Sequence, residues 1–433
     1  MSAYGARMSD IHLPQRASLG IDFGTTNSVI VIATPEGETR TLRVSFPEQE
    51  EGEACRTLLC LWQEESKGRL TLCDAIGEGA VDAYLDDPAE SRLIMSMKSY
   101  LAQRSFRETR LFGKSFTLEM LIARFLACLM RGVGVDPTTV KATVGRPVHF
   151  VGDDNDLGEK RLRDSFVAAG FRDIGVALEP EAAGWRFAHR LDRPATILVG
   201  DFGGGTSDFS ILRIDPDSGG RAQALGYSGV GIAGDQFDYR IISNVVAPHL
   251  GSDSTYTIMG GEPLPMPVEW YASLGRWHRL SLMRTPQTLR SMEDVVRTAS
   301  EPARLRALIS IIEDQQGQAL YRAVSAAKVA LSRHERAMFR FNHKDIVIEQ
   351  EITRKDFESW IAPDVACFDN AVQNALTQAN LTESDIDRVF LTGGTSFVPA
   401  VRAVFDQRFG RDRVDTGGEF VSVAEGLALM SRA

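Results

Sequence analysis

The stretch VGDFGGGTSDFSIL, residues 199–212, decides the fold, because its Asp-Phe-Gly and its three glycines each suggest a different known architecture. Protein kinases use Asp-Phe-Gly to hold magnesium, but no glycine-rich loop, strand lysine or His-Arg-Asp loop accompanies the motif in this sequence. Dinucleotide-binding folds place a glycine-rich turn against a pyrophosphate, but that turn opens a helix, whereas SDFSIL continues as a β-rich strand. The stretch therefore predicts a third arrangement, a hairpin of two strands joined by a glycine-rich turn.

A second copy of this hairpin lies near the start of the chain, in DFGTTNSVIVI from Asp22. In both copies an apolar strand ends in an acidic residue, Asp22 or Asp201, and small or hydroxyl residues form the turn. Short side chains let backbone N–H groups approach phosphate oxygens, and each carboxylate supplies an oxygen for a hydrated divalent cation. The repetition predicts two homologous α/β lobes that face one another across a cleft holding a magnesium nucleotide.

The composition is that of an ordinary soluble globular protein, with 433 residues, 43% hydrophobic and 24% charged, which leaves room for two lobes or more. A formal net charge of −10 argues against broad binding to nucleic acid or to anionic membranes. The N-terminus lacks the apolar core of a signal peptide, and the apolar run LIARFLACLM is too short for a bilayer. Five cysteines without Cys-x-x-Cys spacing indicate reduced thiols, so we expect a cytoplasmic protein.

Seven segments together resemble the nucleotide-binding domain of the DnaK-type heat-shock chaperones, within the actin and sugar-kinase superfold. They occur in the family's order and span about residues 18–433: GIDFGTTNS (20–28), GRPVHF (145–150), LEPEAAG (178–184), DFGGGTSDFS (201–210), GIAGDQFD (231–238), LTGGTSFVP (391–399) and VAEGLAL (423–429). The resemblance implies a two-lobed actin-like ATPase fold of duplicated ribonuclease H-like α/β domains with inserted subdomains. It also implies ATP or ADP with Mg²⁺ as ligands.

The domain organisation that the resemblance implies has a disordered leader, residues 1–16, followed by lobe I, residues 17–200, and lobe II, residues 201–433. Each lobe carries an inserted subdomain, at about 48–115 in lobe I and at about 241–350 in lobe II, where residues 248–325 enlarge it and suggest a docking surface for a protein partner. We expect little regular structure over residues 48–74, a short helix carrying Lys98, and a final helix at about 421–432. The sequence ends directly after that helix, so we expect no peptide-binding domain.

The resemblance also implies roles for individual residues. Asp22 and Asp201 would hold magnesium through water, Lys98 would touch the γ-phosphate, and Glu179 would orient the attacking water; Thr206 completes this catalytic set. Pro147 would lie at the lobe hinge. The residues expected to contact the nucleotide are Gly24, Thr25, Thr26, Asn27, Gly203, Gly204, Gly205, Thr206, Gly234, Asp235, Lys328, Ser332, Gly393, Gly394, Thr395 and Phe397.

Departures from the family pattern leave several functions open. Ser325, Val329 and Phe397 stand where the family usually places a glutamate and two arginines around the purine, so the choice between adenine and guanine is open. The first hypothesis is a slow magnesium-dependent ATPase that acts as a nucleotide-gated switch, related to chaperones through a partner. The alternatives are a small-molecule kinase, with Asp208 or Asp235 as general base, and a nucleotide-binding scaffold without hydrolysis.

Overall fold

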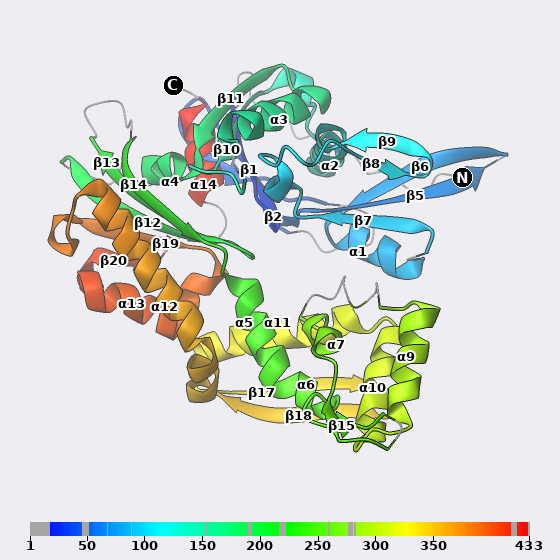
Figure 1. The fold of residues 1–433 in the computed structure, drawn as a ribbon. Coiled ribbons are helices and arrows are strands. Elements are labelled where there is room, and N and C mark those ends of the chain that lie inside the picture. The colour runs from blue at the N-terminus through cyan, green and yellow to red at the C-terminus, as the bar shows by residue number, and fades with distance from the viewer. Residues whose placement is uncertain are drawn as a thin grey trace. The chain divides into compact units, whose positions relative to one another are not determined.

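The computed structural model describes residues 18–45, 52–66, 68–87, 89–152, 154–188, 193–215, 222–258, 260–275, 280, 283–416 and 422–431 (Figure 1). The expected leader, residues 1–16, lies outside these ranges. The chain divides into two compact units: unit 1 is Met1–Val230, Ala371–Ser396 and Phe405–Ala433, and unit 2 is Gly231–Asn370 and Phe397–Val404. The lobe boundary predicted between residues 200 and 201 falls inside unit 1 and stays a prediction, as do the other predicted domain boundaries.

The first sheet of unit 1 surrounds the strand that ends at Asp22. Its order is β11 (Asp173–Leu178), β10 (Lys141–Arg146), β1 (Ser18–Phe23), β2 (Asn27–Ala33) and β3 (Thr39–Thr41), with β4 (Cys55–Arg56) paired to β2. β1 runs antiparallel to β2 and parallel to β10. Its apolar side chains are fully buried, as expected for a central strand covered on both faces.

The second sheet of unit 1 repeats this arrangement around the strand that ends at Asp201. Its order is β14 (Ala222–Val230), β13 (Ser207–Ile214), β12 (Ala195–Phe202), β19 (Arg388–Thr392) and β20 (Val414–Thr416). β12 runs antiparallel to β13 and parallel to β19. Each sheet therefore has a hairpin on one side of its acid-ended strand and parallel strands on the other.

Two helices, α4 (Glu179–Ala188) and α14 (Ser422–Met430), lie between these sheets (Figure 1). Ala424 and Ala428 of α14 pack on β2, while Val423 and Leu427 pack in the core of the second sheet. The approach to β1 is so close that a Cβ added to Gly20 would lie 2.0 Å from the Ala424 carbonyl oxygen. Small residues thus set how near the two acid-ended strands come to one another.

The outer faces of the sheets are covered by longer helices. α2 (Leu118–Val133) and α3 (Asn155–Ala168) pack on the first sheet. On the second, Phe405 of α13 (Pro399–Phe409) packs against Phe202 and Phe209, and a Cβ on Gly226 would lie 2.4 Å from the carbonyl oxygen of Ala375 in α12 (Arg354–Ala379). These contacts leave the turn ends of the strands as the open edge.

The part of unit 1 between β4 and α2 contains more β-structure than we expected from its sequence. Residues 48–74 include most of a three-stranded antiparallel sheet of β6 (Arg69–Ile76), β5 (Leu58–Ser66) and β7 (Ser91–Met95), so that expectation is wrong. The longer pairing, of β5 with β6, joins strands that are neighbours in the sequence, and the pairing of β5 with β7 is shorter. The sequence pattern hides the first because β5 ends in polar and acidic residues, which are depleted in strands. The remaining elements are α1 (Gly77–Asp86), the 3₁₀ helix η1 (Met97–Tyr100), β8 (Glu108–Leu111), β9 (Lys114–Thr117) and η2 (Pro137–Thr139).

Unit 2 is mainly helical. Its elements are α5 (Gly234–Ile241), a π-helical turn (Ile242–Val246), α6 (Ala247–His249), β15 (Thr255–Tyr256), β16 (Leu264–Pro265), α7 (Val268–Ala272), α9 (Pro286–Val296), α10 (Pro302–Glu313), α11 (Gly317–Arg333), β17 (Arg336–His343), β18 (Ile346–Thr353) and the first part of α12. Thr285 caps α9, because its hydroxyl accepts the Thr288 N–H at 3.1 Å. Further 3₁₀ helices among the described residues are η5 (Glu383–Asp385), η6 (Gly394–Phe397) and η7 (Arg411–Arg413).

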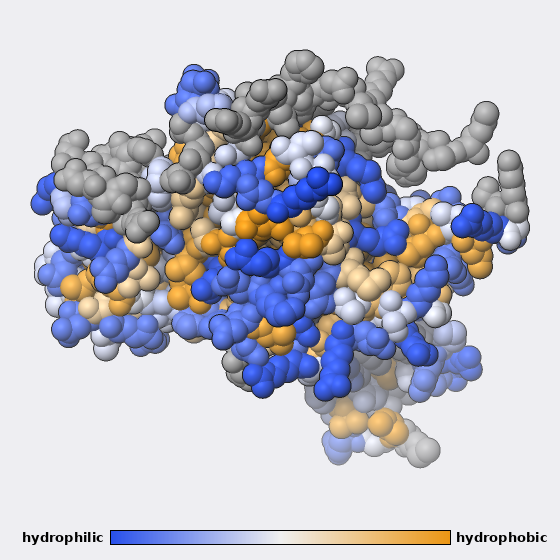
Figure 2. Space-filling model, turned by 90° about the horizontal axis from the view of Figure 1, so that it is seen from above, coloured by the Kyte–Doolittle hydropathy of each residue, from blue (hydrophilic) through white to orange (hydrophobic). Residues whose placement is uncertain are grey.

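Figure 2 shows one face of the molecule, coloured by residue hydropathy. Hydrophilic side chains predominate there, and hydrophobic ones gather in separate patches. Within the part of the chain that the structure describes, no helix has the length and apolarity needed to span a bilayer.

Candidate functional site

The two acid-ended hairpins have the same local geometry. Asp22 is the next-to-last residue of β1, and Asp201 is the next-to-last residue of β12. In the first turn the Gly24 N–H donates to the Asn27 carbonyl at 3.0 Å; in the second the Gly203 N–H donates to the Thr206 carbonyl at 2.9 Å. The duplication predicted from the sequence is therefore present in the backbone hydrogen bonds.

The turns of the two hairpins face one another inside unit 1. A Cβ added to Gly204 would lie 2.2 Å from the Thr26 hydroxyl oxygen, so the second turn touches the first. Thr25, Thr26, Asn27 and Thr206 are half-buried at this edge, while Gly203 and Gly205 are exposed. The structure thus brings together the turn residues predicted to hold phosphate.

A buried ion pair lies beside these turns. Lys98, on η1, is 8% exposed, and its Nζ donates to Glu179 Oε1 at 2.5 Å. Burial acts to lower the pKa of Lys98, but the carboxylates of Glu179, Asp22 and Asp201 together raise it above its ordinary value. The lysine therefore stays charged, at a position that is electrostatically coupled to both strand-end aspartates.

The aspartates themselves are held at an electrostatic cost. Burial, followed by repulsion from Glu179, raises the pKa of Asp22 from 3.8 to about 8, although Lys98 opposes the shift. The same two causes raise the pKa of Asp201, whose Oδ1 accepts a hydrogen bond from the Thr392 hydroxyl at 2.8 Å. Three carboxylates and one ammonium form a cluster that is net negative when ionised, which favours a cation as an additional partner.

A hydrated magnesium ion fits these donors. Mg²⁺ prefers oxygen ligands, keeps several waters and is usually held by one or two carboxylates. Among the described residues no set of three or more His, Cys, Asp or Glu side chains is arranged to hold a metal directly. That Asp22 and Asp201 hold the ion through water, as the resemblance implies, stays a prediction.

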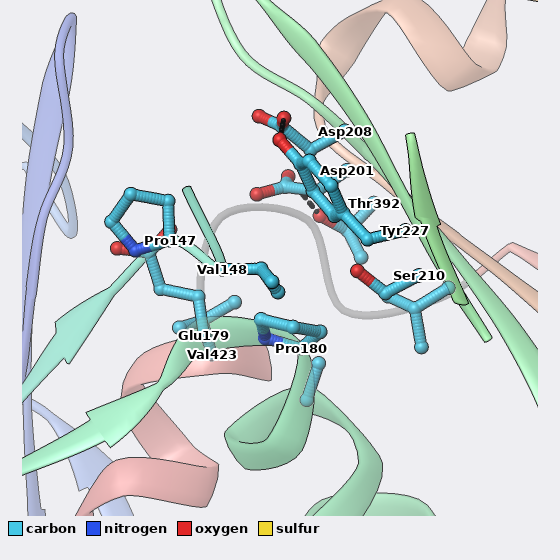
Figure 3. Close-up of a pocket in the computed structure, with 12 residues that line it drawn as sticks. Pro147, Val148, Glu179, Pro180, Asp201, Asp208, Ser210, Tyr227, Thr392 and Val423 are labelled. Atoms are coloured by element: carbon cyan, nitrogen blue, oxygen red, sulfur yellow. Dashed lines mark hydrogen bonds between the residues drawn. The ribbon is translucent and has the colours of Figure 1, made fainter. Parts of the chain in front are cut away.

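A small cavity of about 20 Å³ adjoins this cluster (Figure 3), which is room for about one water molecule. Asp201, Asp208 and Tyr227 lie on its sheet side, with Pro147 and Glu179 opposite. Burial raises the pKa of Asp208 to about 6, while its hydrogen bond from Tyr227 acts to lower it. Sequence reasoning noted Asp208 only as an alternative base and missed Tyr227, whose position on β14 carries no motif.

The Gly-Gly turn after β19 also reaches the phosphate edge. Gly393 has φ 84°, and a Cβ there would lie 2.0 Å from the Phe202 carbonyl oxygen, so only glycine fits. Gly394 and Thr395 follow on η6, and Thr395 is buried. These three predicted residues lie in unit 1 beside β12.

The remaining predicted contacts form a separate group in unit 2. Lys328 Nζ lies 2.9 Å from the buried Asp238 carboxylate and donates to the Gly234 carbonyl at 3.2 Å. Ser332 follows one turn later on α11 and bonds the Lys328 carbonyl, while Asp235 is exposed at the start of α5. Sequence reasoning did not anticipate the pair with Asp238, which already engages Lys328.

Two apolar side chains are exposed in this second group. Val329 is 47% exposed on α11, and Phe397 is 42% exposed. Exposed aromatic rings are costly to leave in water and are suited to stacking on a planar ligand.

Paired strand-turn-strand elements with facing turns, a buried lysine–glutamate pair and two strand-end aspartates give the chain the class of an α/β protein with a candidate phosphate-binding site. Comparisons with known proteins agree with this class. Residues 295–432 match the family model described as Hsp70 protein. The chain is 27% identical over 421 residues to the chaperone protein DnaK of Thermosipho africanus, 25% identical over 420 residues to that of Thermotoga neapolitana, and 27% identical over 415 residues to that of Halobacterium salinarum.

These alignments cover 95% of the chain but only 58%, 59% and 55% of the respective relatives. They confirm the resemblance stated from the motifs: the chain is similar to the DnaK chaperones and to the Hsp70 proteins. The Hsp70 match implies the actin-like fold, and the described structure is mixed α/β.

Proposed function

We propose that this chain binds ATP with Mg²⁺ and hydrolyses it slowly, and that its two states form a switch read by a partner protein. The observation that supports this most is the contact between the two turns, with the Lys98–Glu179 pair coupled to Asp22 and Asp201 beside them. The shared strand order of the two sheets further supports a two-lobed fold of duplicated ribonuclease H-like domains.

Each residue of the cluster has a role in this proposal. The backbone N–H groups of the two turns bind phosphate oxygens, and Lys98 places its ammonium at the terminal phosphate. Glu179 holds Lys98 in place and accepts a hydrogen bond from the attacking water. Asp22 and Asp201 hold the water shell of Mg²⁺, which when bound neutralises phosphate charge. Because the ammonium is buried and fixed beforehand, it stabilises developing charge without reorganisation.

The nucleoside contacts that the resemblance implies are proposed for residues of unit 2. Lys328 and Ser332 would face the ribose, with Gly234 and Asp235 near them, and the exposed ring of Phe397 would stack on the base. Stacking on an aromatic ring tolerates any base, so we propose weak discrimination between adenine and guanine.

The relatives are named chaperone proteins, and we propose a chaperone-related role that acts through a partner docked on the lobe II insert. We place this activity in the cytoplasm, because the five free cysteines suit a reducing compartment.

The test is a magnesium-dependent titration with ATP and ADP, followed by a phosphate-release assay on the same sample. Lys98→Met should reduce phosphate release by about a hundredfold or more while the Kd for Mg-ADP changes little. Lys114→Ala, at an exposed lysine on β9, is the matched control and should leave both unchanged. Unaltered turnover in Lys98→Met would contradict the assignment.

A small-molecule kinase is the second candidate, favoured by the Asp208 carboxylate in the cavity beside Asp201. Phosphate released in the absence of any added acceptor favours the ATPase. ADP formed only when a hydroxylated acceptor is present, with the phosphoryl group recovered on that acceptor and not as free phosphate, favours the kinase. Tight nucleotide binding without either reaction favours a scaffold.

A further inference from the structure

Tyr227 makes the most specific contact in the cavity that the proposed chemistry does not use. It lies on β14, the edge strand of the second sheet, and its hydroxyl donates to Asp208 Oδ1 (Figure 3). The other carboxylate oxygen, Oδ2, lies 3.5 Å from the Thr206 hydroxyl, in the phosphate-binding turn. One carboxylate therefore connects the edge strand to the turn.

The neighbouring strand position makes room for this contact. Gly229 pairs with Asp208 across the sheet, and a Cβ added to it would lie 2.7 Å from both Asp208 Oδ1 and the Tyr227 hydroxyl oxygen. Any side chain at position 229 would therefore push the two bonded atoms apart. The backbone is shaped around the Tyr227–Asp208 bond.

The tyrosine is also fixed from its other sides. Its backbone N–H donates to Gln378 Oε1 at 3.1 Å, and its ring meets the His149 ring edge-on, with centroids 5.2 Å apart. His149 is itself held by Asn155, whose Nδ2 lies 2.8 Å from His149 Nδ1. A ring held by the backbone and by a neighbouring ring loses little freedom when it positions a carboxylate.

We infer that Tyr227 is a positioning residue for phosphoryl chemistry. It binds Oδ1 of Asp208 and thereby keeps Oδ2 of Asp208 facing the turn that contains Thr206. This inference rests on the proposed nucleotide hydrolysis. A buried carboxylate needs donors to keep one orientation. Without the tyrosine hydroxyl, the 3.5 Å contact with Thr206 is too weak to fix Asp208.

The test is a double-mutant cycle with Tyr227→Phe and Asp208→Asn. Tyr227→Phe keeps the ring and its contact with His149 but removes the hydroxyl, and we expect kcat to fall about tenfold while the Kd for Mg-ADP changes less than about twofold. In the Asp208→Asn background the same change should alter kcat less than about twofold, because residues that act as one unit are non-additive. Gly229→Ala, which crowds the same bond, should reproduce the Tyr227→Phe loss.

Tyr271→Phe is the matched control. Tyr271 is a buried tyrosine of unit 2 whose hydroxyl donates to the Leu250 carbonyl at 3.1 Å. Loss of the Tyr271 hydroxyl should lower the thermal midpoint of unfolding but leave kcat unchanged. The second readout is the Kd for Mg-ADP with aluminium fluoride, a stand-in for the transferring phosphoryl group, which needs no turnover and should weaken about tenfold in Tyr227→Phe.

Wild-type kcat in Tyr227→Phe, or additive losses in the cycle, overturns the inference while leaving the proposed function intact. If the wild-type protein binds Mg-ATP but does not hydrolyse it, the proposed ATPase activity is wrong. The double-mutant cycle is then evaluated only from the Kd for Mg-ADP with aluminium fluoride. A wild-type protein that neither binds nor hydrolyses overturns both.

Discussion

Replacing Asp22 by asparagine should stabilise the metal-free protein. Its pKa is raised from 3.8 to about 8, so at pH 7 the folded state keeps this carboxyl mostly protonated while the unfolded chain ionises it. Keeping the carboxyl protonated in the folded state costs about 1.4 kcal/mol for each pH unit between its ordinary pKa and pH 7. The loss of folding free energy caused by Asp22 therefore has an upper bound of about 4 kcal/mol. We expect Asp22→Asn to raise the free energy of unfolding by about 2–4 kcal/mol in EDTA at pH 7.

The pH and metal dependence give this prediction its sign. Because the pKa of Asp22 is higher in the folded state, its contribution to the free energy of unfolding is most favourable below about pH 4. That contribution is lost as the pH rises through about 8. Asp22→Asn should reduce that slope, leaving the contribution of Asp201, whose pKa is also raised. Mg²⁺ binds the ionised form, so it should stabilise the wild type more than the variant.

Urea unfolding at pH 5 to 9, in EDTA and in Mg²⁺, measures both effects. Asp294→Asn is the control, because its side chain is 72% exposed in an i,i+3 ion pair and should change stability by less than about 0.5 kcal/mol. The reasoning is refuted if Asp22→Asn destabilises the metal-free protein at pH 7, or if Mg²⁺ stabilises variant and wild type equally.

Three further outcomes follow from particular contacts. Gly204→Ala should reduce nucleotide affinity and phosphate release, because the added Cβ would lie 2.2 Å from the Thr26 hydroxyl oxygen. In a parallel melting assay, Gly205→Ala should have nearly the thermal midpoint of the wild type, because a Cβ there meets nothing within 4 Å. Phe397→Ala should weaken ATP and GTP binding alike, by about tenfold in calorimetry, and a loss confined to one base would argue against stacking. Asp314→Asn should lower the free energy of unfolding by about 1 kcal/mol at pH 7, because the hydrogen bond from His343 and the contact with Lys344 lower the pKa of Asp314. The difference in unfolding free energy between variant and wild type should shrink as the pH falls below about 4. A difference that stays constant with pH would show that the charge of Asp314 is not responsible.

The paired hairpins could be predicted because their signals are local. An apolar strand, an acidic end, a turn of small residues and a second apolar strand each appear within about a dozen residues, so Asp22 and Asp201 were identified from pattern alone. The resemblance placed Lys98 and Glu179, which are 81 residues apart. Without it, Lys98 would pass as a surface lysine, because only tertiary contact reveals that it is buried.

Other features could not be predicted because they arise from packing between distant segments. Tyr227 reaches Asp208 only through the register of β13 and β14, and the pair of Lys328 with Asp238 joins two helices. The sheet of β5, β6 and β7 was missed for a different reason: β5 and β6 form a local hairpin, but the acidic residues at the end of β5 do not fit a strand pattern.

The electrostatics of the cluster explain why such an arrangement persists. Asp22, Glu179 and Asp201 surround one lysine, and burial raises the pKa of both aspartates. Hydrophobic residues in these places would make a more stable protein. A site with excess buried negative charge gains most from a divalent cation, because the cation removes repulsion that the fold itself cannot relieve. The same repulsion would make the affinity for the metal–phosphate complex depend on both aspartates, so neutralising Asp22 or Asp201 should weaken metal binding while strengthening the metal-free fold.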